Sequence, residues 1–76
     1  MTGRPAPTRD DVVAMLATFG DRGTEAVHES IDSLELAWLV RETEQRYGVL
    51  LDLEDDELTR MTTVSGAVAV LAEALA

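Results

Sequence analysis

Residues 31–48 read IDSLELAWLVRETEQRYG, and this stretch decides the fold. Asp32 suits the N-cap of a helix, and Glu35 three residues later completes a capping box in which aspartate replaces serine or threonine. Gly48 suits the end of the same helix. The stretch therefore predicts a helix that begins beside Asp32 and closes at Gly48.

The predicted helix has two different faces. At about 100° per residue, one set of side chains falls within about 60° of Leu36, and we expect this face to be buried. It consists of Leu36, Leu39, Val40, Thr43 and Tyr47. A second stripe lies about 140 to 200° from Leu36, where a helix normally meets water. It consists of Leu34, Trp38, Arg41 and Gln45. This stripe has the composition of an interface hot spot, unless Trp38 folds over a neighbouring loop and is partly core.

The chain before this helix predicts one more helix and a long loop. Thr8 can cap a helix that ends at Gly20 and carries acidic residues in its first turn. Its apolar stripe consists of Val12, Met15, Leu16 and Phe19. Residues 21–31 contain Gly23 and no sustained period, which predicts a loop anchored by Val27 and Ile31.

The chain after Gly48 predicts a short helix and a final one. The acidic residues 54–57 suit the first turn of a helix that ends near Arg60, with Leu58 and Met61 pointing inward. Thr62 or Thr63 can cap the last helix. Its inward stripe consists of Val64, Ala67, Val68, Leu71 and Leu75. We therefore expect an all-α protein, a small four-helix bundle with three main helices, a short third helix and a long first loop. Residues 1–7 are expected to form a flexible tail, and residues 8–76 a single domain.

Length and composition limit what this chain can be. Its 76 residues suffice for one domain and leave no room for a second core or a deep catalytic cleft. The aromatic residues are Phe19, Trp38 and Tyr47, so the core must consist mainly of Leu, Val, Met and Ala. Cysteine is absent, which excludes disulfides, thiolate metal sites and a thiol nucleophile. Thioester chemistry would need a sulfur that is added to the chain.

The chain is strongly acidic, with a formal net charge of −9. This charge disfavours nucleic acid or an anionic membrane as a partner and favours basic protein surfaces. No apolar run approaches the roughly 20 residues of a membrane span, and residues 1–7 lack the apolar segment of a signal peptide. We expect a cytoplasmic protein and a monomer, since an exposed tryptophan alone does not imply a dimer.

Ser33 directly follows the predicted N-cap. It could help to cap the helix, be exposed without a role, or carry a function, and its spacing alone leaves these alternatives open. A catalytic nucleophile is disfavoured, because the sole histidine, His28, lies in the loop and no glycine-rich elbow or oxyanion motif accompanies it. His28 is expected to be a surface residue. The acidic cluster at residues 54–57 lacks the alternating aspartates and glycine of a calcium loop, so no metal site is assigned.

The chain resembles an acyl carrier protein, the four-helix carrier of fatty-acid and polyketide synthesis, over residues 10–75. The matching residues are Asp32-Ser33-Leu34-Glu35-Leu36, Leu39-Val40, Glu44, Tyr47-Gly48-Val49, Leu51-Asp52 and Thr62-Thr63-Val64. The Asp-Ser-Leu triplet alone is a weak motif. Its position after a long loop, with an aromatic residue 14 positions after Ser33 and Thr-Thr-Val further on, makes the combination fairly specific.

The resemblance implies that Ser33 receives 4′-phosphopantetheine from coenzyme A, in a reaction catalysed by a separate magnesium-dependent phosphopantetheinyl transferase. Asp32 is then expected to cap the helix and to help orient the site. The thiol of the arm would hold acyl groups as thioesters, so the chain itself would not be an enzyme. Expected partners are the transferase and acyl-loading, ketosynthase or acyltransferase-type enzymes with basic docking surfaces. The residues expected to contact them are Leu34, Glu35, Trp38, Arg41, Glu42 and Gln45.

Three residues depart from the family pattern. A glycine commonly stands two positions before the aspartate, where this chain has Ser30, and Arg41 and Arg46 interrupt the acidic helix typical of primary fatty-acid carriers. A discrete carrier of a specialised polyketide or fatty-acid-like pathway therefore fits better than housekeeping fatty-acid synthesis.

Two alternative functions remain. The first is a peptidyl or aminoacyl carrier of a nonribosomal peptide pathway. Such carriers more often show Gly-Gly before a His-Ser or Asp-Ser pair, so Ile31-Asp32 favours acyl cargo. The second is an unmodified helical module that binds a partner through the Trp38 face. An enzyme is the least supported class, because no pair of titratable residues has a spacing suited to acid and base roles.

Overall fold

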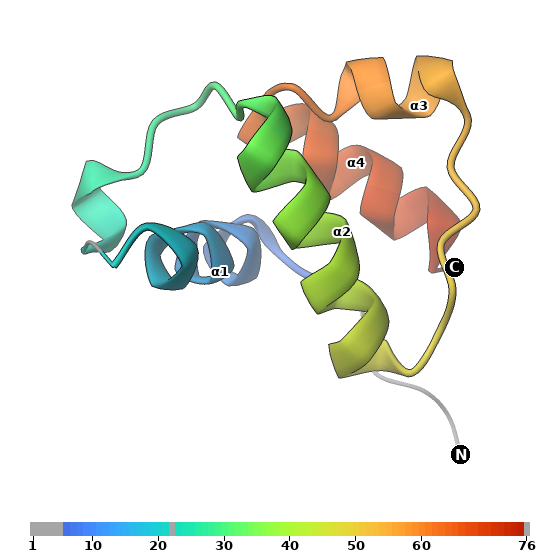
Figure 1. Cartoon of the computed structure of the whole chain (residues 1–76), viewed down its shortest axis with the longest axis horizontal. Helices are drawn as coiled ribbons and strands as arrows, with labels where there is room; N and C mark the ends of the chain where they lie inside the picture. The colour runs from blue at the N-terminus through green and yellow to red at the C-terminus, as the bar shows by residue number, and fades with distance from the viewer. Residues whose placement is uncertain (1–5, 22, 76) are drawn as a thin grey trace.

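The computed structural model describes residues 6–21 and 23–75, and these ranges contain four α-helices and no β-strand. The elements in chain order are α1 (Arg9–Gly20), the 3₁₀ turn η1 (Thr24–Ala26), α2 (Ser33–Tyr47), α3 (Asp55–Arg60) and α4 (Val64–Ala74). Helix α1 packs against both α2 and α4, and the short α3 packs against α4 (Figure 1). The expected all-α bundle with a short third helix is confirmed.

Two residues of the expected tail are described by the structure. Pro7 is buried and Ala6 is half-buried. Residues 1–5 lie outside the described residues.

The helix ends follow local sequence signals. Thr8 Oγ1 accepts the N–H of Asp11 at 3.2 Å, which caps α1. Of the two candidate threonines before α4, Thr63 is the cap, since its hydroxyl accepts the N–H of Gly66 at 3.0 Å. Gly48 closes α2 in the left-handed conformation, with φ of 64°. The local patterns thus fix where these helices begin and end.

The core is built mainly from aliphatic side chains of α1, α2, α4 and the residues next to α3. Its buried members are Val12, Met15, Leu16, Ile31, Leu39, Met61, Val64, Ala67, Val70 and Leu71. Thr43 is also buried, and its hydroxyl donates to the Leu39 carbonyl at 2.8 Å, so no polar group of this side chain is left unsatisfied. The residues of the predicted inward faces are all buried or half-buried. Those that are only half-buried are Phe19, Leu36, Val40, Tyr47, Leu58, Val68 and Leu75, and Ala17 and Val70 are buried in addition.

The long connection between α1 and α2 is tied down at its end. Val27 is half-buried and Ile31 is buried, as expected for its anchors. Ser30 and Thr63 form an isolated antiparallel bridge. In this bridge the Ile31 N–H donates to the Thr62 carbonyl and the Val64 N–H to the Glu29 carbonyl, both at 2.8 Å. The start of α2 is therefore fastened to the turn that precedes α4.

Candidate functional site

Ser33 is the first residue of α2 and is exposed. Two residues earlier the chain is anchored by the buried side chain of Ile31. The Ser33 hydroxyl takes part in no hydrogen bond within the described part of the chain. A macromolecule can therefore reach this oxygen while the backbone that carries it is held by the bundle.

Asp32 is the N-cap of α2 and forms both hydrogen bonds of a capping box with Glu35. Its Oδ1 accepts the Glu35 N–H at 2.8 Å, and the Asp32 N–H donates to Glu35 Oε1 at 3.0 Å. The first backbone bond of the helix runs from the Leu36 N–H to the Asp32 carbonyl at 2.9 Å. The N–H groups of Ser33 and Leu34 precede these bonds and have no acceptor among the described residues. Two free N–H groups and the positive end of the helix dipole thus lie beside the Ser33 hydroxyl. This arrangement favours a phosphate ester on that oxygen.

We expect Asp32→Ala to lower the thermal midpoint of unfolding. The loss of the N-cap should cost about 1 kcal/mol, which corresponds to about 4 to 8 °C in a domain of this size. Asp52→Ala is the matched control, since Asp52 is exposed in the segment between α2 and α3 and makes no hydrogen bond to any described residue. Equal midpoints for the two variants would contradict the capping role.

The outward stripe of α2 is exposed only in part. Leu34 is 71% exposed, in keeping with its expected outward position. The expectation that Trp38 faces solvent is wrong for part of the ring, because Trp38 is half-buried against the core and its ring centroid lies 5.2 Å from that of Phe19. The physical reason is that α1 packs beside α2 and covers this side of the helix. Trp38 is thus partly core, as in the alternative, but the residue that its ring meets is Phe19 of helix α1 and the alternative expected a loop.

The other residues expected to contact partners differ in their exposure and in the bonds they form within the chain. Arg41 and Gln45 are exposed. Glu42 is half-buried, and its carboxylate accepts the Nε–H of Arg46 at 2.7 Å. Glu35 is half-buried and belongs to the capping box. The side chains most open to a partner are therefore Leu34, Arg41 and Gln45.

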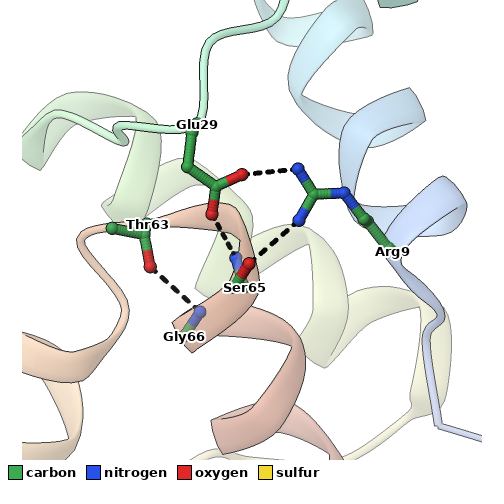
Figure 2. Close-up of polar contacts among 5 residues, drawn as sticks. All are labelled: Arg9, Glu29, Thr63, Ser65 and Gly66. Atoms are coloured by element: carbon green, nitrogen blue, oxygen red, sulfur yellow. Dashed lines mark hydrogen bonds and ion pairs between the residues drawn. The ribbon is translucent and has the colours of Figure 1, made fainter.

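A polar cluster that the sequence did not predict lies just before the site (Figure 2). Glu29 Oε1 accepts from Arg9 Nη2 at 2.5 Å, and Glu29 Oε2 accepts the Ser65 N–H at 2.8 Å. Arg9 Nη1 also donates to the Ser65 hydroxyl at 3.0 Å. These three residues, hereafter the Arg9–Glu29–Ser65 clamp, join α1, the loop before α2 and the first turn of α4.

The clamp gives Glu29 an unusually acidic carboxyl. The hydrogen bond from Arg9 and those from Ser65 lower the pKa of Glu29 from 4.5 to about 2. Because the folded-state pKa lies below the unfolded value, this carboxylate stabilises the fold fully above pH 4.5 and loses that effect as the pH falls toward 2. Because the Arg9–Glu29 pair is exposed, we expect Glu29→Gln to lower the thermal midpoint only slightly, with the difference from the wild type largest above pH 4.5 and shrinking toward pH 2. A constant difference across this range, followed by circular dichroism, would refute the assignment.

Residues 6–21 and 23–75 contain no pocket and no group of three or more His, Asp or Glu residues able to hold a metal ion. None of the helices in these ranges is long and apolar enough to cross a membrane. His28 is exposed in the loop, as expected.

No protein-family model, curated protein or solved structure matches this chain.

Proposed function

We propose that this chain is a discrete acyl carrier protein whose Ser33 carries 4′-phosphopantetheine. The observation that carries the proposal is the exposed Ser33 hydroxyl at the start of α2, on a backbone anchored by Ile31. The resemblance around Asp32-Ser33-Leu34 supports the same residue. The chain supplies the hydroxyl and its orientation, and partner enzymes supply the catalysis.

The attachment is a phosphoryl transfer to the Ser33 oxygen. A new bond forms between this oxygen and the phosphorus next to pantetheine, the phosphoanhydride bond of coenzyme A breaks, and adenosine 3′,5′-bisphosphate leaves. The hydroxyl proton passes to a base of the transferase. The unengaged N–H groups of Ser33 and Leu34 favour the resulting phosphodiester. The group then supplies a thiol that tethers acyl intermediates as thioesters.

The acidic character of the chain suits partners with basic docking surfaces. The chain has a net charge of −9, and an electrostatic attraction of this kind speeds the encounter of oppositely charged proteins. Leu34, which is 71% exposed, adds an apolar contact directly beside the serine. A specialised polyketide or fatty-acid-like pathway is the proposed setting, in the cytoplasm.

The decisive experiment is intact-mass measurement after incubation with coenzyme A, magnesium and a broad-specificity phosphopantetheinyl transferase. The expected result is the addition of one phosphopantetheine group. A chain that gains no mass, while a known carrier in the same reaction does, would contradict the proposal and leave the unmodified interaction module as the better explanation.

A further inference from the structure

The loop before Ser33 changes character at Glu29. From Gly23 to His28 every residue but the half-buried Val27 is exposed. The backbone bonds of this part are local, from the Ala26 N–H to the Gly23 carbonyl at 3.0 Å and from the Val27 N–H to the Thr24 carbonyl at 3.2 Å. At Glu29 the bonds become long-range, since its carbonyl accepts the Val64 N–H at 2.8 Å. Glu29 is therefore the first residue after Gly23 whose backbone is bonded to a distant part of the chain.

The side chain of Glu29 reinforces the same attachment. Its carboxylate binds the Ser65 N–H, one residue beyond the Val64 N–H that its carbonyl binds. Arg9 holds the carboxylate from the α1 side and also reaches the Ser65 hydroxyl (Figure 2). The clamp thus ties the backbone four residues before Ser33 to two helices at once.

The clamp is more important for local order than for global stability. The side chains of Arg9 and Glu29 are 55% and 45% exposed, and ion pairs this exposed contribute little to the free energy of unfolding. The clamp can matter more for local opening of the loop before α2, because the free energy of local opening depends only on the few bonds that hold this loop closed. Without the clamp, the segment before α2 is held only by the two backbone bonds of the bridge and by the buried side chain of Ile31, so it should open more often.

We infer that Arg9 and Glu29 are positioning residues for the modification of Ser33, holding the loop-to-helix junction in the arrangement that the transferase binds. This inference rests on the carrier function proposed above. A transferase that binds only the closed junction has an apparent affinity reduced by the fraction of chains in which the junction is open. The chemical step in the bound complex is unaffected. The clamp therefore acts on KM and leaves kcat unchanged.

The test compares the kinetics of phosphopantetheine transfer to Glu29→Gln with those of a matched control. Glutamine keeps an oxygen for the Ser65 N–H and loses the charge that holds Arg9, so the fold is preserved. Glu73→Gln is the control, because the Arg60–Glu73 pair is similarly exposed, at 47% and 58%, and joins α3 to α4 without touching the loop. Loss of the Arg9–Glu29 pair should raise the ratio of open to closed junctions about fivefold. KM follows the smaller fraction of closed chains, so we expect the KM of Glu29→Gln to rise about twofold at unchanged kcat, and that of Glu73→Gln to stay at the wild-type value.

Two further measurements separate positioning from a general loss of stability. Arg9→Gln should raise KM at least as much as Glu29→Gln, since it also loses the bond to the Ser65 hydroxyl. The double variant should be no worse than Arg9→Gln alone, because both changes remove the same Arg9–Glu29 pair. Amide hydrogen exchange of Ile31 and Val64 should be faster in Glu29→Gln than in Glu73→Gln. Equal KM values for Glu29→Gln and Glu73→Gln, or unchanged exchange at both amides, would overturn the inference while leaving the carrier function intact. A wild-type chain that accepts no phosphopantetheine would overturn both.

Discussion

The Ser33→Ala variant is expected to gain no phosphopantetheine under conditions that modify the wild type completely. Alanine lacks the oxygen that must form the new bond to phosphorus, so the loss should be total. The fold should be unaffected, because Ser33 is exposed and makes no hydrogen bond within the described residues. Exposed substitutions of this kind usually change the free energy of unfolding by less than about 0.5 kcal/mol. Intact mass and thermal unfolding measure the two effects separately.

The chain offers its own controls for this result. The sequence contains two other serines, Ser30 and Ser65. Ser30 is exposed three residues before Ser33, so Ser30→Ala tests whether another hydroxyl in the same segment is the acceptor. We expect Ser30→Ala to be modified like the wild type. If Ser33→Ala is still modified, or if Ser30→Ala is the variant that fails to be modified, the attachment site is a different residue.

Gly66→Ala is expected to destabilise this protein more than the same change at Gly23 or Gly48. A Cβ at this position would lie 1.7 Å from the Arg60 carbonyl oxygen, a backbone atom at the end of α3 that cannot swing away. The variant must therefore push α3 and α4 apart. Overpacking of this kind costs about 3 kcal/mol, which lowers the thermal midpoint by about 12 to 24 °C. Thermal and urea unfolding would both report it.

Two other glycines set the scale for this prediction. At Gly23 an added Cβ would meet only the carboxylate of Glu25, at 2.3 Å, and the end of that flexible side chain can move aside. At Gly48 the space is open but φ is +64°, so alanine there carries a moderate backbone strain. The expected order of destabilisation is Gly66→Ala, then Gly48→Ala, then Gly23→Ala. If Gly66→Ala and Gly23→Ala have the same thermal midpoint of unfolding, α3 does not approach α4 as closely as described.

The local parts of the fold could be predicted from the sequence because their signals lie within a few residues of one another. The N-caps Thr8 and Asp32, and the αL glycine Gly48, are each recognised by side chain and spacing alone. Ser33 could be singled out for the same reason, since it directly follows a capping residue. The apolar periodicity of α2 also predicts that Leu39 is buried, and this residue is completely buried.

The contacts between distant segments could not be predicted in this way. The apolar periodicity of α2 predicts a single buried face. Helix α1 covers a second side of α2 and buries part of Trp38 against Phe19. The clamp brings together Arg9, Glu29 and Ser65, which have no pattern in common along the chain. Gly66 did give a signal, because a glycine inside a helix costs about 1 kcal/mol relative to alanine and so points to a packing reason.

The bridge between the loop and the α4 turn joins parts of the chain that a ribosome makes at different times. Glu29 and Ser65, which bond across it, are 36 positions apart. While the residues after Ser33 are still being translated, the turn to which Ile31 and Glu29 bind does not yet exist. A nascent chain that stops before Thr62 therefore displays Ser33 on an unanchored segment, and the junction matures only when α4 has emerged.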